Sequence, residues 1–203
     1  LAVQSIGFKK FLPIGDPSLV VENLNRYGVD EIVILDINPS KNEKRSSYSV
    51  LKEASSFAHV PISIGGGIDS IKRVKKLIQE CADKVIFNTA LVKNEELIKN
   101  SIDQLGSQAV IASLDVKYDK ALDEHLCYTN GGLENINISI QEMIRKVDDI
   151  GVGEIFINSI DRDGSKLGYD RKLFNKMISK KNTPIVVCGG VGSHKHLSIP
   201  KKL

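Results

Sequence analysis

Apolar positions along the chain follow two alternating patterns. Short, nearly continuous apolar runs are typical of strands buried on both faces of a sheet. They predict strands at 31–37, 61–64, 84–87, 108–116, 154–160 and 184–188. Between them, apolar residues recur at helical spacing and predict helices at about 17–27, 50–57, 71–78, 94–105, 139–150 and 170–180. Strands that alternate with helices through short loops predict an α/β protein, built as a (β/α) barrel or a doubly wound sheet.

Four stretches depart from this alternation. Residues 1–15 have no clear period, and residues 38–46 form a polar, Lys-rich loop. Residues 118–138, with Asn130 before Gly131-Gly132, predict a β-hairpin inserted after the strand at 108–116. The tail at 193–203 lacks the apolar stripe of a helix. Its His194 and His196 could be offered as metal ligands, but we interpret the tail as an irregular end.

Two segments of the sequence are repeated at one spacing. The segment from Gly28 to Ile37, GVDEIVILDI, resembles GVGEIFINSI, which begins at Gly151. VPISIGGGI from Val60 resembles TPIVVCGGV from Thr183. Both repeats have an offset of 123 residues, which indicates two half-domains that arose by duplication.

The duplication favours the barrel over the doubly wound sheet. The partners expected for the strands at 84–89 and 108–117 would fall outside the 203 residues. The prediction is therefore an α/β fold, a (β/α)8 TIM barrel that is incomplete because its first and last strands are missing. We expect residues 1–203 to be a single barrel domain, with the ordered barrel part at about 14–192.

The composition of the chain argues against several classes of protein. At 41% apolar residues the chain can bury one sizeable core, and its net charge of +3 is spread over expected helix surfaces, so we expect no nucleic-acid groove. No apolar run is long enough to cross a membrane and residues 1–12 lack the pattern of a signal peptide, so we expect a cytoplasmic protein. Cys81, Cys127 and Cys188 are widely separated, which predicts reduced thiols and neither a disulfide framework nor a zinc site, with Cys188 in the core.

Polar residues and glycines follow the predicted strands, at the end where such barrels carry their active sites. Glycines at two strand ends, 65–67 and 189–190, allow backbone N–H groups to approach an anion closely. Because the two groups belong to different halves, they predict a ligand with a phosphate at each end. A tight turn is the alternative explanation for each group.

Asp115 ends an apolar strand, where a carboxylate is costly unless it is used or paired. General acid or base chemistry is the predicted role, and an ion pair with Lys117 or Lys84 is the alternative. Asp163-Gly164 offers a carboxylate and N–H donors suited to a substrate hydroxyl or phosphate. His125 lies in the predicted insertion and is not expected to be a catalyst.

Charged residues also lie at the opposite ends of three predicted strands. Glu31, Lys84 and Glu154 each begin a strand, and Glu31 and Glu154 are related by the duplication. Such charges normally form ion pairs that close the bottom of a barrel. A gated channel is the alternative.

The segments IVILDI, PISIGGGI, DKVIFNTA, GSQAVIASLDVK, GEIFINSIDRDGSKLGYD and PIVVCGGVG together resemble the cyclase subunit of imidazole glycerol phosphate synthase, over about residues 14–192. The resemblance implies a lyase of histidine biosynthesis. It would use ammonia from a glutaminase subunit and a bis-phosphorylated ribonucleotide, with no cofactor and no metal. Its products would be imidazole glycerol phosphate and an aminoimidazole carboxamide ribonucleotide.

The resemblance also implies roles for individual residues. Asp115 matches the catalytic acid of the family, while Glu31, Lys84 and Glu154 match gate residues and Asp83 an acidic residue on the side that faces the glutaminase. The two phosphate sites are matched by Gly67, Asn88, Thr89, Asp163, Gly164 and Gly190. Gly189 joins them as a predicted phosphate-binding residue because of its place in the second glycine group.

The sequence departs from the family pattern in ways that affect function. The second catalytic aspartate and the gate arginine of the family belong to the first strand, so we expect little or no cyclase activity from this chain alone. Gln4 stands where the family has a lysine, and with the 38–46 loop it resembles relatives that supply ammonia for amidino sugars of surface glycans. A non-catalytic scaffold that activates a glutaminase is a third alternative.

Overall fold

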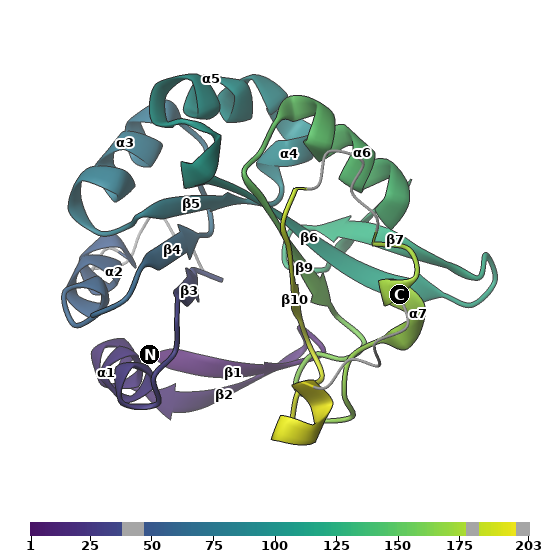
Figure 1. Cartoon of the computed structure of the whole chain (residues 1–203), viewed down its shortest axis with the longest axis horizontal. Coiled ribbons are helices and arrows are strands. Elements are labelled where there is room, and N and C mark those ends of the chain that lie inside the picture. The colour runs from purple at the N-terminus through teal and green to yellow at the C-terminus, as the bar shows by residue number, and fades with distance from the viewer. Residues whose placement is uncertain (38–46, 178–182, 198–203) are drawn as a thin grey trace. The chain divides into compact units, whose positions relative to one another are not determined.

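The computed structural model describes residues 1–37, 47–177 and 183–197 (Figure 1). Within these residues the chain divides into two compact units. The first consists of Leu1–Val3 and Leu12–Ile111, and the second of Gln4–Phe11 and Ala112–Leu203. The expectation of a single barrel domain stays a prediction. The polar loop predicted at 38–46 lies outside the described residues, as do residues 178–182 and the end of the tail. The helix predicted at 170–180 is shorter than expected, since its helical residues end at Phe174 and Asn175 is the C-cap.

The first unit contains three parallel strands, β3 (Ile32–Leu35), β4 (Ile62–Gly65) and β5 (Lys84–Phe87). Its helices are α1 (Pro17–Arg26), α2 (Ser47–Ser55), α3 (Ile71–Glu80), α4 (Ala90–Lys93) and α5 (Glu95–Leu105), followed by the 3-10 turn η1 (Ser107–Ala109). Helix α1 begins where predicted, because the Asp16 side chain accepts from the Ser18 amide and Pro17 occupies the first helical position. Asn94 caps α5 in the same way, by accepting from the Leu97 amide.

The second unit contains the strands β6 (Val110–Asp119, whose first two residues belong to the first unit), β7 (Glu124–Thr129), β8 (Glu134–Ser139), β9 (Glu154–Ser159) and β10 (Ile185–Cys188). Strands β9 and β10 are parallel, whereas β7 pairs antiparallel with both β6 and β8. The predicted hairpin insertion is therefore confirmed. Helices α6 (Ile140–Ile150) and α7 (Arg171–Phe174) and the 3-10 turn η2 (His194–Leu197) complete the unit. The predicted capping box is present at α6, between Ser139 and Glu142.

The amino-terminal residues form two strands that the sequence pattern did not predict, β1 (Ala2–Ile6) and β2 (Lys10–Gly15), paired in a two-stranded sheet. Five of the six residues of β2 are exposed. Neither face of that strand is buried, so no alternation of apolar and polar residues marks it.

The duplication extends to the register of the sheets. In the first unit Ile32 of β3 lies opposite Ile62 of β4, and in the second unit Ile155 of β9 lies opposite Ile185 of β10. Each residue of the second pair follows its counterpart by the 123 residues of the sequence repeat. The two halves therefore share the register of their strand pairs. Unrelated pairs of strands would have the same register only by chance, because a shift of one residue gives a different register.

The predicted fold class is confirmed. The described residues contain the six strands predicted from the apolar runs, where a complete (β/α)8 barrel has eight. Each of the six is followed by a helix or 3-10 turn, in the case of β6 after the hairpin strands β7 and β8. Their side chains form the core, with Ile64, Val85, Ile111 and Ile157 at most 1% exposed. No helix among the described residues is both long and apolar enough to cross a membrane.

Candidate functional site

The centre of the candidate site in the second unit is a pair of buried polar side chains. Asp115 lies on β6 and Asn158 on the neighbouring strand β9, and each is 7% exposed. Asn158 Nδ2 donates a hydrogen bond to Asp115 Oδ1 over 3.0 Å. The amide fixes one carboxylate oxygen in place, since a buried hydrogen bond of this kind restricts the rotation of both groups.

The surroundings of Asp115 raise the pKa of its carboxyl toward neutral pH. Burial raises the pKa of this carboxyl, the hydrogen bond from Asn158 lowers it, and the charge of Asp163 raises it, so that the pKa lies at about 6. A carboxyl with a pKa near the working pH can both give and take a proton efficiently. The ion pair with Lys84 or Lys117 stays the alternative interpretation of Asp115.

Asp163 lies in the loop between β9 and α7 and is fixed by backbone contacts. Its amide donates to the Ser159 carbonyl over 2.9 Å, and its own carbonyl accepts from the Gly7 amide over 3.1 Å. Its Oδ2 atom also accepts from the Phe8 amide over 3.3 Å. A Cβ atom on Gly164 would come within 2.5 Å of the Ser5 carbonyl oxygen. The segment Gln4–Phe11 therefore helps to shape this loop, a role that sequence reasoning missed because the contact spans 155 residues.

The glycines predicted to bind phosphate make equivalent close approaches in the two units. In the first, a Cβ atom on Gly66 would overlap the carbonyl oxygen of Asp36, and in the second, one on Gly189 would lie 2.8 Å from that of Ser159. Both glycines have positive φ, +107° and +110°. This backbone packing explains the need for glycine at the two positions, so it supports the tight-turn alternative there without excluding an anion.

The other predicted phosphate residues lie at the carboxyl ends of their strands. In the first unit, Gly67 (φ +59°) follows β4, and Asn88 and Thr89 follow β5. In the second unit, a Cβ atom on Gly190 would overlap the carbonyl oxygen of Gly168, whose amide in turn donates to the Gly190 carbonyl over 2.7 Å. The loop after β10 is thereby fastened to the loop after β9.

Cys188 does not lie in the core, contrary to the prediction. It ends β10, which pairs only with β9 among the described strands, and the residue is exposed. Although the residue as a whole is exposed, desolvation of its thiol raises the pKa, and the charge of Asp163 raises it further. The thiol is therefore protonated at neutral pH and is a weak nucleophile.

The predicted gate residues of the first unit are in contact. Lys84 Nζ donates to Glu31 Oε2 over 2.9 Å, and Ser63 Oγ donates to Glu31 Oε1. Asp83 lies beside them in sequence, where its Oδ2 atom accepts from the Ile62 amide over 2.8 Å. Glu154 begins β9 in the second unit, at the same end of its strand.

Sequence reasoning also missed a buried pair on the hairpin. His125 on β7 is 1% exposed, and its Nε2 atom lies 3.0 Å from Asp170 Oδ2 at the start of α7. Asp161 likewise pairs with the hairpin, because its Oδ2 atom accepts from the Tyr118 amide over 2.8 Å. The position of His125 within an apolar strand was the available signal.

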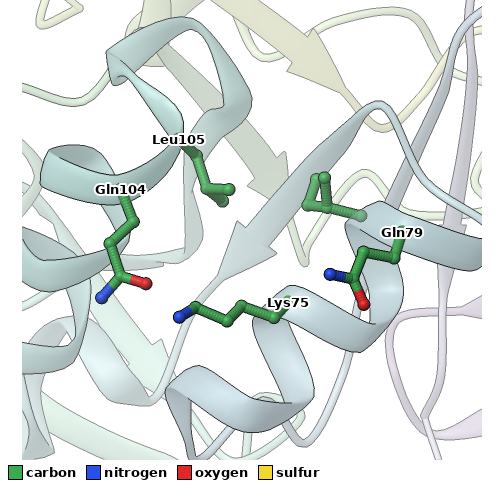
Figure 2. Close-up of a pocket in the computed structure, with 5 residues that line it drawn as sticks. Lys75, Gln79, Gln104 and Leu105 are labelled. Carbon is green, nitrogen blue, oxygen red and sulfur yellow. The ribbon is translucent and has the colours of Figure 1, made fainter.

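A pocket of about 360 Å³ lies between α3 and α5 of the first unit. Figure 2 shows Lys75 and Gln79 of α3 facing Gln104 and Leu105 of α5. None of the predicted site residues lines this pocket. Among the residues that the structure describes, no group of three or more His, Cys, Asp or Glu side chains could hold a metal ion.

Comparison with known proteins gives consistent matches. Residues 2–202 match the family described as "Histidine biosynthesis protein". The imidazole glycerol phosphate synthase subunit HisF of Saccharolobus solfataricus is 36% identical over 194 residues, which cover 96% of this chain and 76% of the relative. The corresponding subunit of Staphylococcus carnosus is 32% identical with the same coverage, and that of Clostridium botulinum strain Okra is 34% identical, covering 96% of this chain and 77% of the relative.

Proposed function

The chain belongs to the HisF family of histidine biosynthesis proteins, and from that premise we propose that it acts as the ammonia-dependent cyclase of imidazole glycerol phosphate synthase. In this reaction ammonia attacks a phosphoribulosyl-formimino-carboxamide ribonucleotide. The attack and the ring closure that follows yield imidazole glycerol phosphate, an aminoimidazole carboxamide ribonucleotide and one molecule of water. The proposal makes the protein a lyase that needs no cofactor.

The observation that carries the proposal is the environment of Asp115. This carboxyl is buried, is oriented by Asn158 and has a pKa of about 6. Cyclisation and release of the second product both need proton transfer to or from nitrogen and oxygen atoms. A carboxyl that is partly protonated near neutral pH can donate the proton, and its low-dielectric surroundings strengthen its interaction with charge that develops nearby.

The two glycine-containing strand ends would hold the two phosphates of the substrate. In the second unit the phosphate would meet Asp163, Gly164, Gly189 and Gly190, and in the first unit Gly67, Asn88 and Thr89. Support comes from the shared register and the matching glycine conformations of the two halves, because a duplicated backbone suits a ligand with like groups at both ends.

Ammonia would come from a glutaminase subunit that docks at the amino-terminal ends of the strands. The contact between Lys84 and Glu31 supports this role, since a partly exposed ion pair can open at moderate cost. Glu154 and Asp83 would complete the gate and the docking surface. An ion-pair plug that only closes this end remains the alternative, and the glutaminase experiment below separates the two.

We expect a protein with only these 203 residues to have little or no cyclase activity, because the family uses a second aspartate on its first strand. The proposed place of action is the cytoplasm, where the nucleotide substrate would be made. Measurable product from the 203-residue chain supplied with ammonium salt would contradict the expectation of inactivity.

Complementation tests the proposal. The complete gene is introduced into a histidine auxotroph that lacks its own cyclase subunit, and growth without histidine is expected. Asp115→Asn should abolish growth, whereas Asp103→Asn, an exposed aspartate on α5, should not. Equal growth with Asp115→Asn would remove that residue from the mechanism.

The two other functions predict different results. An enzyme for amidino-sugar formation, favoured by Gln4, would fail to complement and its deletion would alter a surface glycan. A glutaminase-activating scaffold would stimulate glutamine hydrolysis without forming imidazole glycerol phosphate. Replacing Lys84 by Met should change that stimulation if the ion pair is a gate, and should leave it unchanged if the pair is a plug.

A further inference from the structure

The loop that carries Asp163 is attached to the inserted hairpin at both of its ends. At the start of the loop, Asp161 Oδ2 accepts a hydrogen bond of 2.8 Å from the Tyr118 amide of β6. At its end, Asp170 Oδ2 lies 3.0 Å from His125 Nε2 of β7. Strands β6 and β7 pair directly, with Tyr118 opposite His125, so the two attachment points belong to one rigid element. Each end of the loop is therefore held by a contact with the same pair of strands.

The second anchor uses an unusual buried residue. His125 is 1% exposed and packs against the ring of Tyr118, with the ring centroids 5.1 Å apart. Its Nδ1 atom is buried and has no hydrogen-bond partner within the described residues. An imidazole that leaves a buried nitrogen unsatisfied destabilises the fold relative to an apolar side chain. The contact made by Nε2 offsets this cost.

Asp170 joins the hairpin, the loop and a helix. While Oδ2 accepts from His125, Oδ1 accepts from the Lys172 amide over 3.0 Å and from the Leu173 amide over 3.3 Å, which begins α7. Burial acts to raise the pKa of Asp170, but the interaction with His125 and the two amides outweighs it, so the pKa is lowered. The carboxylate is therefore ionised at neutral pH, and His125 Nε2 is the donor.

Further contacts near the His125–Asp170 pair also join α7 and the residues after it to the hairpin. Lys172 Nζ donates to Tyr118 Oη over 2.7 Å and to Asp123 Oδ1 over 3.2 Å, and Lys176 Nζ donates to Glu124 Oε1 over 2.6 Å. The side chains of Lys172 and Asp123 are 66% and 80% exposed. The exposed pair Lys172–Asp123 contributes little to stability because water and salt screen it. Lys176–Glu124 is less screened, at 26% and 30% side-chain exposure, and His125–Asp170, at 1% and 11%, is the most buried of these contacts.

We propose that His125 is a positioning residue: by holding Asp170 it fixes the loop of residues 161–170, and with it Asp163, next to Asp115. Asp163 interacts with Asp115 and Cys188 through its charge, so a shift of the loop changes the field at the carboxyl that is proposed to transfer the proton. That His125 positions the loop does not depend on the proposed function. The expected effect of the loop on turnover does rest on the proposed function.

Two substitutions that differ by one methylene group test the structural part. In His125→Gln the amide nitrogen lies as many bonds from the backbone as Nε2, so it can reach Asp170. In His125→Asn the nitrogen lies where Nδ1 was and cannot reach it. Amide hydrogen exchange of the 203-residue chain is followed by mass spectrometry over residues 161–173, with α5 as the internal reference. Thermal melts establish that both variants fold.

We expect exchange over residues 161–173 to accelerate about tenfold or more in His125→Asn, because a lost hydrogen bond to a charged group shifts local opening by that order, and to stay within about threefold of the parent in His125→Gln. Equal exchange in the parent and the Asn variant, or equal acceleration in both variants, overturns the proposal. If the Asn variant does not fold, the Gln variant decides, since loss of its protection would overturn the proposal as well.

Steady-state kinetics of the complete enzyme test the effect on turnover. His125→Asn should raise KM for the bis-phosphorylated nucleotide about tenfold and leave KM for ammonia unchanged, because only the nucleotide is proposed to contact the loop. A general loss of folded protein would lower kcat without separating the two KM values. If exchange accelerates but KM for the nucleotide does not rise, the role in substrate binding is overturned. Absence of turnover in the parent enzyme would overturn the proposed function. The hydrogen-exchange experiment would then decide by itself whether His125 positions the loop.

Discussion

Asn158 donates a 3.0 Å hydrogen bond to Asp115 from the adjacent strand, and both side chains are 7% exposed. This hydrogen bond and the burial of Asp115 shift the pKa of its carboxyl in opposite directions. The hydrogen bond stabilises the carboxylate, which accepts it, while burial destabilises the carboxylate and favours the neutral acid. The pKa of about 6 is the balance of these effects.

Removing the amide should shift this balance. In Asn158→Ala the pKa of Asp115 is expected to rise above the parent value of about 6, because burial and the charge of Asp163 then act unopposed. Carbon-13 NMR titration of the Asp115 carboxyl measures the change. Asn175→Ala, at an exposed position after α7, is the control and should leave the titration unaltered. An unchanged or lower value in Asn158→Ala would mean that the amide does not stabilise the ionised form.

The raised pKa of Asp115 also predicts a pH dependence of stability. The folded-state pKa of about 6 lies above the value of about 3.9 for an unfolded chain, so the folded state binds the proton more tightly. The stabilisation is complete below about pH 4 and is lost as the pH rises through about 6, which amounts to about 3 kcal/mol.

Asp115→Asn removes this titration. The free energy of unfolding of the variant, relative to the parent protein, should therefore increase between pH 4 and pH 7 by up to about 3 kcal/mol, while turnover is lost. Urea unfolding at several pH values provides the measurement. The exposed control Asp103→Asn should give a difference that is flat with pH. A flat difference for Asp115→Asn would show that its carboxyl is not the group that titrates.

Gly190 and Gly151 form a matched pair for testing the loop contact after β10. Their φ angles are +94° and +90°, so alanine introduces similar backbone strain at both positions. A Cβ atom on Gly190 would overlap the Gly168 carbonyl oxygen, whereas nothing lies within 4 Å of one on Gly151. We expect Gly151→Ala to destabilise by about 1 kcal/mol and Gly190→Ala by about 3 kcal/mol or more, with weakened phosphate binding. Chemical denaturation and calorimetry with inorganic phosphate measure the two effects, and equal destabilisation by both substitutions would contradict the clash.

The ion pair between Lys84 and Glu31 should contribute measurably to the stability of the first unit. The two side chains are 24% and 30% exposed, and Ser63 also donates to Glu31. Lys84→Met leaves a partly buried carboxylate without its lysine, so we expect a loss of about 1–3 kcal/mol, part of which Glu31→Gln in the same chain should restore.

A double-mutant cycle measured by urea unfolding gives the coupling energy of this pair. The reference is the pair Lys52–Glu80, at 55% and 34% side-chain exposure, for which we expect a smaller coupling energy because water screens the two charges. A coupling energy for Lys84–Glu31 no larger than that of the reference would show that the contact is a solvated surface pair.

The positions of several strands and helices could be predicted from the sequence, because the patterns that specify them span only a few neighbouring residues. The run at 154–160 became β9, Asp16-Pro17 began α1, and Ser139 with Glu142 formed a capping box. The repeat at an offset of 123 residues likewise anticipated the equal register of β3–β4 and β9–β10, because register follows the order of apolar side chains. By contrast, β2 is almost entirely exposed and β1 has no fully buried residue, so neither left such a signal.

The sequence by itself determined the alternation of strands and helices, the family to which the chain belongs and the place of Asp115 on an apolar strand. It did not give the end of that strand, because β6 continues past Asp115 to Asp119, where it pairs with β7. Only the tertiary structure decided which side chains meet: Asn158 with Asp115, His125 with Asp170, and the Phe8 amide with Asp163. These contacts join residues 43, 45 and 155 positions apart. Periodicity records which face of an element is buried, but the partner of a buried polar group is chosen by the packing of elements that are distant in the chain.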